Sequence, residues 1–522
     1  MTGNVEAVPS PSGPPSPRPR SPVPRPLSAV SRHLGVSVTP ASSGDPADVS
    51  VTGVTLDSRA VRPGDLYAAL AGATAHGADF TAAARRAGGV AALTDPAGRE
   101  RVTSAGLPAL VVADPRAVLG GLAAWVYGQP ADHLTTVGIT GTNGKTTTAY
   151  LVEAGLRAAG RSTGLIGTIE TRIGDQVVAS VRTTPEAPEL QALLAVMVEQ
   201  DVQAVVMEVS SHALAMGRVD GTTYDVAVFT NLSEDHLDFH ADLEDYFQVK
   251  ATLFSRDRAR RGVVDVDDEH GRRLVGQSAV PVVSVSPSGA AADWRVEDPA
   301  LDRDRSTFTL VGPDGRRVSC STALTGGFNL ANAALAVVAL AQVGIEPQVA
   351  ADGVASCAGV PGRMERVSRA GSPGPLALVD YAHSPDALER LLAAVRPLAG
   401  PGRVLLVIGC GGDRDPYKRP VMGRIAARDA DVAVLTNDNP RSEDPLAIIA
   451  DMRRGADQVP GAVVEVQADR AAAIRRAVRL AGPGDVVVIA GKGHEQGQEV
   501  AGAVLPFDDR AVLRAELEAV SA

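Results

Sequence analysis

The chain has 522 residues, of which 50 are Lys or Arg and 61 are Asp or Glu, so its formal net charge is −11. A chain of this length forms roughly two to four domains, and the acidic balance argues against a nucleic-acid-binding protein, which would carry a basic face. The sequence shows no apolar stretch long enough to cross a membrane, no signal peptide, and three cysteines without the spacing of a metal site, so we expect a cytoplasmic protein without disulfide bonds.

Residues 1–27 form a Pro-rich extension. Nine of these residues are proline, and Ser, Gly and Arg make up much of the rest. Such a composition cannot bury enough apolar surface to fold. We therefore predict a disordered tail over residues 1–27.

The first folded region, residues 28–130, has the rhythm of a small α/β domain. Residues 49–70 are expected to hold two strands around a polar turn, and the apolar segments 90–95 and 109–114 predict further short parallel strands between helices. The Gln129-Pro130 pair marks the expected end of this domain.

The segment TTVGITGTNGKTTT at 135–148 predicts a phosphate-binding loop between a strand and a helix that opens at Lys145. Gly141 and Gly144 let backbone N–H groups approach a phosphate, the Lys145 amine can reach the outer phosphates, and the Thr146 hydroxyl suits Mg²⁺. The dipole of the helix points its positive end at the same anion. The loop is shorter than the common nucleotide-binding form, because Ile139 stands where that form has its first glycine.

Two further apolar segments, 204–210 and 225–233, predict strands that are buried on both faces in a central region spanning 131–355. The carboxyl ends of parallel strands form the binding crevice of a doubly wound sheet. Glu208 and Asn231 are therefore expected beside the phosphate loop. A carboxylate there suits Mg²⁺, and His236, which follows in DHLDFH, is a further candidate ligand.

Lysine is scarce in this chain. Only four of the 50 basic residues are lysine, namely Lys145, Lys250, Lys418 and Lys492. This bias suggests that lysine is kept where a compact charge or a nucleophilic amine is needed. On the predicted helix around Lys250, the amine is expected either to be modified or to pair with a bound anion, the alternative being an exposed side chain.

The third region, residues 356–522, contains four apolar strands that each end in a polar cluster. These segments are 375–385, 403–416, 431–445 and 485–495, and helical spacing between them predicts a second doubly wound domain. PGRMER at 361–366 is a candidate hinge. The clusters are expected to present basic and acidic groups to one crevice: Arg414, Arg441, Lys492, Asp438 and Glu495. Such a mixture suits a zwitterion such as an amino acid, because guanidinium groups grip carboxylates.

Taken together, these motifs resemble the Mur ligases over about residues 50–510. The motifs occur in this order: GTNGKTTT, TTPE (183–186), EVSSHAL (208–214), FTNLSEDHLDFH (229–240), GGFNLANA (326–333), PGRME (361–365), DYAHSPDAL (380–388), GGDRDPYKRP (411–420), DNPR (438–441) and GKGHE (491–495). The resemblance implies an α/β protein of three domains. These are an N-terminal UDP-binding domain (28–130), a central P-loop ATPase with a doubly wound, mostly parallel sheet (131–355), and a C-terminal Rossmann-like domain that binds an amino acid (356–522).

The resemblance also implies an ATP-dependent amide ligase of peptidoglycan synthesis. Its substrates would be ATP, UDP-MurNAc-L-Ala-D-Glu and, because DNPR at 438–441 resembles the family members that use it, meso-2,6-diaminopimelate. The γ-carboxylate of D-Glu would be phosphorylated, and the incoming amine would attack the acyl phosphate. A monomer that binds neither nucleic acid nor membrane is expected.

Family motifs assign roles to individual residues. The resemblance makes Lys145, Glu208, His236 and Lys250 catalytic. It assigns two Mg²⁺ ions to Thr146, Glu208 and His236, and it matches Lys250 to a family lysine that CO₂ converts into a carbamate (N6-carboxylysine). The ATP contacts would be Gly141, Thr142, Asn143, Gly144, Lys145, Thr146, Thr147, Asn329 and Asp380.

Two further groups of residues match the sites for the other substrates. For the UDP-sugar dipeptide they are Leu56, Ser58, His76, Gly77, Ala78, Thr183, Thr184, Ser210 and Arg218. For diaminopimelate they are Arg414, Asp438, Asn439, Pro440, Arg441, Gly491 and Glu495. Arg182 and Met216 depart from the family pattern and are left out of the predicted site. Because the ligands are split between the second and third regions, we expect the domains to close around the substrates.

Three alternatives remain open at this point. The same ligase could add L-lysine, or the chain could be another amide ligase of the superfamily, such as a folylpolyglutamate synthase. A nucleotide-dependent switch with a degenerate site would lack some of Lys145, Glu208, His236 and Lys250, all of which are present.

Overall fold

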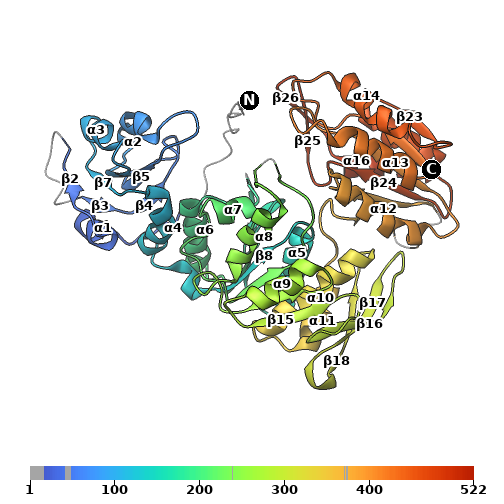
Figure 1. Ribbon diagram of the computed structural model, residues 1–522, viewed down its shortest axis with the longest axis horizontal. Coiled ribbons are helices and arrows are strands. Elements are labelled where there is room, and N and C mark those ends of the chain that lie inside the picture. The colour runs from blue at the N-terminus through green and yellow to red at the C-terminus, as the bar shows by residue number, and fades with distance from the viewer. Residues whose placement is uncertain are drawn as a thin grey trace.

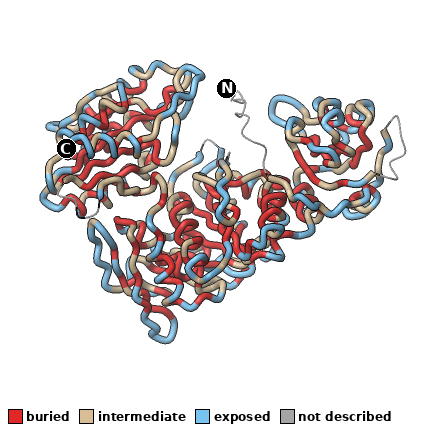
Figure 2. The backbone as a smooth tube through the Cα atoms, turned by 180° about the vertical axis from the view of Figure 1, so that it is seen from behind, coloured by how far each residue is buried: buried red, intermediate tan, exposed pale blue. Residues whose placement is uncertain are grey.

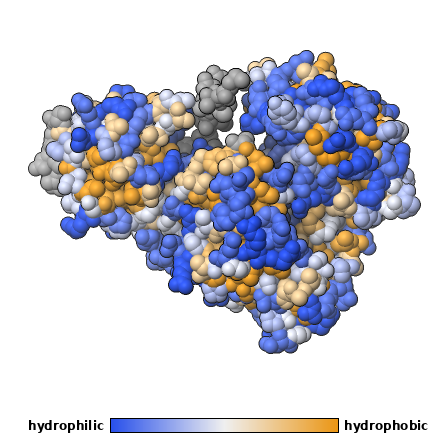
Figure 3. Space-filling view, in the orientation of Figure 1, coloured by the Kyte–Doolittle hydropathy of each residue, from blue (hydrophilic) through white to orange (hydrophobic). Residues whose placement is uncertain are grey.

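Three α/β units follow one another in the computed structural model, which describes residues 17–41, 49–180, 182–237, 239–369, 371 and 374–521 (Figure 1). Each unit has its own β-sheet, and the buried residues concentrate in the strands and the inner helix faces of each unit (Figure 2). Hydrophilic residues cover most of the C-terminal unit on the face seen in Figure 3. Among the described residues, none of the helices has the length and apolar character that a membrane crossing requires.

The N-terminal unit is built on a five-stranded sheet in the order β2-β7-β6-β5-β4, parallel except for β2. Its elements are β1 (Arg25–Pro26), α1 (Leu27–Leu34), β2 (Val38–Thr39), β3 (Ser50–Val51), β4 (Gly53–Thr55), β5 (Asp65–Ala69), η2 (Gly77–Phe80), α2 (Thr81–Arg86), β6 (Ala91–Thr94), α3 (Arg99–Ser104), β7 (Ala109–Val111), α4 (Pro115–Val126) and the 3₁₀ helix η3 (Pro130–His133). The parallel strands expected at 90–95 and 109–114 are present.

The predicted disordered tail departs from expectation where the structure describes it. Its first 16 residues lie outside the described part of the chain. From Pro17 onward, however, the backbone is docked on the protein: the N–H of Arg20 donates to the Glu199 carboxylate at 2.9 Å, and β1 pairs with β3. Composition reflects only how much apolar surface a segment can bury. Polar docking of a Pro-rich segment on a surface that is already folded leaves no sign in it.

The central unit contains an eleven-stranded sheet in the order β11-β10-β9-β12-β8-β13-β14-β15-β16-β17-β18. The seven strands from β9 through β12, β8, β13, β14 and β15 to β16 are parallel to one another, whereas β10 and β11 at one edge and β17 and β18 at the other pair antiparallel. Its strands are β8 (Thr135–Thr140), β9 (Thr163–Ile166), β10 (Glu170–Ile173), β11 (Gln176–Ala179), β12 (Ala204–Glu208), β13 (Val226–Phe229), β14 (Gly262–Asp265), β15 (Val282–Ser286), β16 (Trp294–Ala300), β17 (Ser306–Val311) and β18 (Arg317–Thr322).

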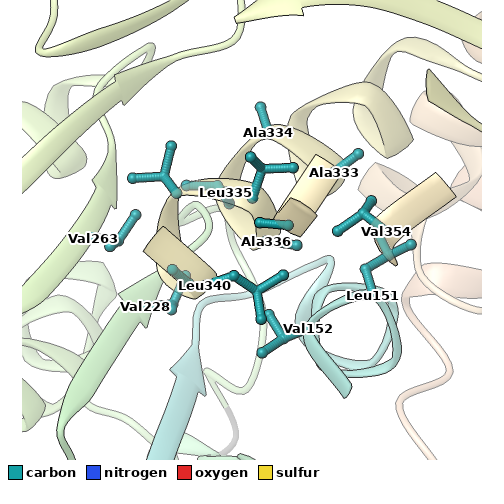
Figure 4. Close-up of a cluster of buried hydrophobic side chains, with 14 of the residues drawn as sticks. Leu151, Val152, Val228, Val263, Ala333, Ala334, Leu335, Ala336, Leu340 and Val354 are labelled. Carbon is teal, nitrogen blue, oxygen red and sulfur yellow. The ribbon is translucent and has the colours of Figure 1, made fainter. Parts of the chain in front are cut away.

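Helices cover both faces of this sheet. They are α5 (Lys145–Ala158), α6 (Ala187–Glu199), α7 (Ser211–Ala215), α8 (Leu243–Ala251), η4 (Thr252–Phe254), α9 (Glu269–Gln277), η5 (Pro313–Gly315), α10 (Gly327–Gln342) and α11 (Pro347–Ala355). Helix α10 is apolar on nearly every face, which is typical of a fully buried helix. Its Leu335 and Leu340 lie in one cluster with Val152 of α5 and Val228 and Val263 of the sheet (Figure 4). This core fixes α5, and therefore the loop that precedes it.

The C-terminal unit has a six-stranded sheet in the order β19-β20-β24-β21-β22-β23, parallel except for β19. Its elements are β19 (Glu365–Arg366), β20 (Leu376–Asp380), α12 (Pro385–Ala399), β21 (Val404–Ile408), α13 (Lys418–Asp429), β22 (Val432–Leu435), α14 (Pro445–Ala456), β23 (Val464–Val466), α15 (Arg470–Leu480), β24 (Val486–Ala490), β25 (Gly497–Val500), β26 (Ala503–Pro506) and α16 (Asp509–Ser521). The four predicted strands are β20, β21, β22 and β24. Together, the three mostly parallel sheets confirm the predicted α/β class.

Candidate active site

Strand order brings the predicted motifs together. In the central sheet β8 lies between β12 and β13, so Glu208 at the end of β12 and Asn231 just after β13 flank the loop that follows β8. In the C-terminal sheet β24, β21 and β22 are neighbours, so the polar segments that follow them share one edge. The carboxyl ends of parallel strands form the crevice in both units, as in other doubly wound sheets.

The loop 141–147 has the backbone of a phosphate cradle. Gly144 has φ 87° and immediately precedes α5, so the loop turns into the helix through a left-handed residue. At Gly141 (φ 143°) an added Cβ would lie 1.9 Å from the Thr230 hydroxyl oxygen, so only glycine fits. Helix α5 begins at Lys145, as predicted, and its N-terminal N–H groups face the loop.

A cavity of about 720 Å³ opens beside this loop, within the size range of small-molecule sites. Residues of the central and C-terminal units line it together. From the predicted site these are Thr142, Asn143, Gly144, Lys145, Thr146, Thr147, Thr183, Glu208, Ser210, His236 and Asp380. The cavity is therefore shared between the second and third units of Figure 1.

The Lys145 amine folds back over its own loop. Its Nζ donates to the carbonyl oxygens of Gly141 at 2.8 Å and Thr142 at 2.9 Å. Burial lowers the pKa of this amine, and the nearby Glu208 carboxylate opposes that shift. Bound phosphate oxygens would supply a stronger, charged acceptor for this side chain.

The Thr146 hydroxyl and the Glu208 carboxylate form a pair of hard oxygen donors. Thr146 Oγ1 donates to Glu208 Oε2 at 2.8 Å, and the N–H of Thr168 donates to Glu208 Oε1 at 2.7 Å. Within the described ranges, no group of three or more His, Cys, Asp or Glu side chains forms a ready metal site. Mg²⁺ commonly uses one or two protein oxygens, with waters and substrate phosphates completing its shell. The Thr146–Glu208 pair fits that demand.

His236 lies at the rim of the cavity with a 45% exposed side chain. Its backbone has φ 55°, a conformation that is uncommon for a residue other than glycine and that clusters at functional sites. The imidazole packs edge-on against that of His212, with ring centroids 4.9 Å apart.

Lys250 is buried, contrary to the exposed alternative. The residue is 1% exposed, and its Nζ donates to Gly141 O at 2.9 Å and lies 4.4 Å from the centre of the Tyr246 ring. Gly141 O thus accepts from two lysines, Lys145 and Lys250. Burial, and then the charge of Lys145, hold the pKa of the Lys250 amine well below its usual range. A neutral amine at this place is a nucleophile.

Two residues to which the sequence assigned no role, Arg363 and Asn332, also line the cavity, and a third, Asp386, bonds to the lining residue Asn143. Arg363 reaches from the C-terminal unit to Thr146 Oγ1 (3.4 Å), and Asp386 accepts from Asn143 Nδ2 (3.1 Å) and Ser233 Oγ (2.8 Å). Asn332, rather than the predicted Asn329, faces the cavity, and its Oδ1 accepts from Thr148 at 3.3 Å. Asn329 stands behind it and accepts from Asn332 Nδ2 at 3.1 Å. The spacing of the two asparagines in NLAN, three residues apart on a helix, could have indicated that they share a face.

Residues predicted to bind the UDP-sugar dipeptide fall in two places. Thr183 and Ser210 line the cavity, with Thr184 beside them donating to Glu208 O at 2.9 Å, and Arg218 pairs with Glu186 at 2.8 Å. The others belong to the N-terminal unit and do not line the cavity: Leu56, Ser58, His76, Gly77 and Ala78. There, His76 Nε2 lies 3.1 Å from Asp95, and its Nδ1 accepts from Ala78 N at 3.0 Å.

The predicted amino-acid contacts gather in a separate cluster at the ends of β21, β22 and β24. This acceptor cluster consists of Arg414, Asp438, Asn439, Pro440, Arg441, Gly491 and Glu495. Lys492 is fully buried and ties the cluster together, donating to Asn439 Oδ1 and Glu495 Oε2 at 3.0 Å each. An added Cβ at Gly491 (φ 110°) would lie 2.6 Å from Asp438 Oδ2, so the glycine lets that carboxylate sit over the backbone.

Tyr381 connects the cavity to the acceptor cluster. It lines the cavity, and its ring lies 5.2 Å from that of His494, which belongs to GKGHE. Burial lowers the pKa of His494 to about 4, so this imidazole is neutral at working pH.

Asp265, on the wall of the cavity, gives a prediction about pH. Burial, together with Asp267 and Asp268, raises the pKa of this carboxyl from 3.8 to about 7. The unfolded chain therefore releases this proton at lower pH than the native protein, and native stability falls as pH rises from about 4 to 7. Asp265→Asn keeps an oxygen for the N–H of Asp267, 3.0 Å away, and removes the charge. The variant should melt about 2–6 °C above the parent at pH 8 and close to it at pH 4.5.

The control for this prediction is Asp175→Asn, at a side chain that is 92% exposed. Thermal unfolding followed by circular dichroism at both pH values is the measurement. Equal melting temperatures for Asp265→Asn and the parent at pH 8 would contradict the assignment.

Comparison with known families matches all three units. Residues 50–127 match the family described as "Mur ligase family, catalytic domain", residues 139–340 "Mur ligase middle domain", and residues 362–493 "Mur ligase, glutamate ligase domain".

Two curated relatives match nearly the whole chain. A Streptomyces coelicolor protein named UDP-N-acetylmuramoyl-L-alanyl-D-glutamate--2,6-diaminopimelate ligase is 58% identical, covering 94% of this chain and 96% of its own. A Leifsonia xyli protein named UDP-N-acetylmuramyl-tripeptide synthetase is 47% identical with the same coverage.

Solved structures share the fold. A structure with the same diaminopimelate ligase name is 33% identical, with a TM-score of 0.67, covering 92% of this chain and 97% of its own. A folylpolyglutamate synthase from Mycobacterium tuberculosis, complexed with ADP, is 20% identical with a TM-score of 0.56, covering 71% of this chain and 90% of its own, and shares the fold alone.

Proposed function

Since the chain belongs to the Mur ligase family, we propose that it is the ATP-dependent ligase that joins meso-2,6-diaminopimelate to the D-Glu γ-carboxylate of UDP-MurNAc-L-Ala-D-Glu. The observation that carries this proposal is a pair of adjoining sites. A phosphate-loop cavity opens between two units, and an acceptor cluster with charges of both signs lies next to it. We further propose that the protein acts in the cytoplasm, where ATP is supplied, and that it acts as a monomer.

The first chemical step joins two anions, and the cavity supplies the positive charge that this requires. The γ-carboxylate oxygen attacks the γ-phosphorus of ATP, ADP leaves, and an acyl phosphate forms. Lys145 and the loop N–H groups hold the β- and γ-phosphates, so that charge developing in the transition state meets fixed donors. Arg363, close to Thr146, adds a guanidinium on the side of the C-terminal unit.

Mg²⁺ would be held by Thr146 and Glu208, and a second ion by His236 and a carbamate on Lys250. When bound, the metal ions offset the negative charge of the phosphates. The carbamate forms when the neutral Lys250 amine attacks CO₂ and loses one proton, which leaves an anion. An arginine at this place could not form that anion.

In the second step the amine of the acceptor attacks the acyl carbon, phosphate leaves, and the amine loses a proton. The acceptor cluster holds the far end of the amino acid, with Arg414 and Arg441 on its carboxylate and Asp438 and Glu495 on its ammonium group. A zwitterionic far end distinguishes diaminopimelate from lysine, whose side chain ends in an amine alone.

An isotope-transfer experiment tests this function. With ¹⁸O in both γ-carboxylate oxygens of the dipeptide substrate, one labelled oxygen should pass into each released phosphate, and the product should carry the acceptor in amide linkage. Phosphate released without label would show that water attacks ATP, and would contradict the ligase proposal.

A further inference from the structure

The hairpin β25–β26 follows directly after GKGHE and folds back onto the DNPR segment, residues 438–441. It lies at the edge of the C-terminal unit (Figure 1). Four hydrogen bonds in which at least one partner is a backbone atom join it to three residues of that segment. They are Gln498 Nε2 to Asp438 O (2.7 Å), Glu499 N to Asn439 Oδ1 (3.0 Å), Arg441 N to Glu499 O (3.0 Å) and Ala501 N to Arg441 O (2.7 Å).

The backbone of Arg441 needs such support. Its φ is 52°, in the left-handed region that an arginine rarely occupies, and such residues persist where the surroundings over-determine them. Its N–H and its C=O are both bonded to the hairpin, at Glu499 and Ala501. The hairpin is therefore what holds Arg441 in this conformation.

The guanidinium of Arg441 is fixed as well. Its Nε donates to Glu499 Oε2 at 3.1 Å, and its Nη1 donates to Gly412 O at 2.7 Å. Within the described part of the chain Nη2 has no hydrogen-bond partner. These two hydrogen bonds fix the plane of the guanidinium group. They leave Nη2 available to donate to an incoming carboxylate.

A purely stabilising role for the hairpin fits the burial pattern poorly. All four residues of its outer strand β26 are exposed, with Val504 at 71% and Leu505 at 52%. A strand with so little buried apolar surface adds little to the free energy of folding. Its polar contacts instead concentrate on the segment that we propose binds the acceptor.

We propose that the hairpin is a positioning element of the acceptor site, and that Glu499 is a positioning residue that orients Arg441 toward the acceptor carboxylate. This inference rests on the proposed function. It concerns the affinity for the acceptor alone, because Glu499 touches neither the phosphate loop nor the cavity.

Steady-state kinetics of Glu499→Gln tests the inference. The amide keeps the size of the side chain but removes the charge that holds the guanidinium. The KM for diaminopimelate should rise about tenfold, while KM for ATP and for the UDP-substrate stay within about twofold and the melting temperature is unchanged. Glu499→Asp should recover part of the loss, since its charge remains. The matched control is Glu465→Gln, which removes the charge of Glu465 on the edge strand β23, where it pairs with Arg476 of α15 at 2.8 Å.

A second variant addresses the hairpin itself. Ala501 (φ 48°) and Gly502 (φ 80°) form a two-residue turn with positive φ at both positions, and an added Cβ at Gly502 meets no atom within 4 Å. Gly502→Ala therefore acts through backbone strain alone and should raise the same KM selectively.

Unchanged acceptor KM in both variants, or equal rises in all three KM values, would overturn the inference. If the parent protein shows no turnover with the acceptor at all, the proposed function fails instead.

Discussion

Replacing Lys250 with arginine is expected to lower kcat by on the order of 10³-fold, the cost of removing one preorganised charged group from a phosphoryl-transfer site. The Lys250 amine is buried, has its pKa held well below the usual value, and lies within 2.9 Å of the phosphate-loop carbonyl of Gly141. These properties favour a neutral amine that reacts with CO₂. Arginine stays protonated and cannot form a carbamate.

Intact-mass measurement in bicarbonate buffer separates this account from simple loss of packing. The parent should carry the added mass of one CO₂ and lose it, together with activity, in CO₂-free buffer. Lys418→Arg is the control, since Lys418 is only partly buried and donates to His383 O at 2.9 Å. It should keep both the added mass and most of the activity. Full activity of Lys250→Arg would contradict the carbamate.

Replacing Asp509 with alanine is expected to lower the free energy of unfolding of the C-terminal unit by about 3–5 kcal/mol, since it leaves a buried charge without its partner. The Arg470 and Asp509 side chains are both fully buried, and their bidentate contacts measure 2.8 and 2.7 Å. The same guanidinium donates to Asn437 O (3.1 Å) and Ala490 O (2.9 Å), the residues just before DNPR and GKGHE.

Urea unfolding of three variants is the measurement. The double variant Arg470→Met/Asp509→Leu removes both charges and should be much less destabilised than Asp509→Ala. Asp457→Asn serves as the control in the same unit, since the side chains of its pair with Arg453 are 55% and 42% exposed and the expected loss is below about 1 kcal/mol. Equal losses for Asp509→Ala and Asp457→Asn would contradict the role of the buried pair.

The sequence predicted the strands that are buried on both faces and the loop between β8 and α5. Their signals are local: continuous apolar runs such as 204–208 and 486–490, and glycines placed before a helix. The antiparallel strands β16–β18 and the hairpin β25–β26 were not predicted. Strands β17 and β18 alternate between buried and more exposed residues, which is the pattern of half-buried strands, so this alternation could have indicated them. Strand β26 is exposed throughout, so its pattern differs little from that of a loop.

Site residues could be identified where a motif fixes both type and place, as for Lys145 and Glu208. Contacts between residues that lie far apart in the sequence could not be identified in this way. Asp386 accepts a hydrogen bond from Asn143, which lies 243 positions away in the sequence. The hydrogen bond between Arg441 and Glu499 depends on a hairpin that no sequence motif predicts. The docking of Arg20 on Glu199 is of the same kind, because it depends on the placement of two distant surfaces.

The most direct test of the central claim is phosphate release from ATP in the presence of Mg²⁺ and UDP-MurNAc-L-Ala-D-Glu, with meso-diaminopimelate and L-lysine offered in parallel. The zwitterionic far end of diaminopimelate matches the Arg441 and Asp438 pair of the acceptor cluster, so we predict turnover with diaminopimelate and at most a trace with lysine. Comparable turnover with lysine would contradict the assignment of the acceptor cluster, and no turnover with either amine, in a folded protein that binds ATP, would contradict the proposed function.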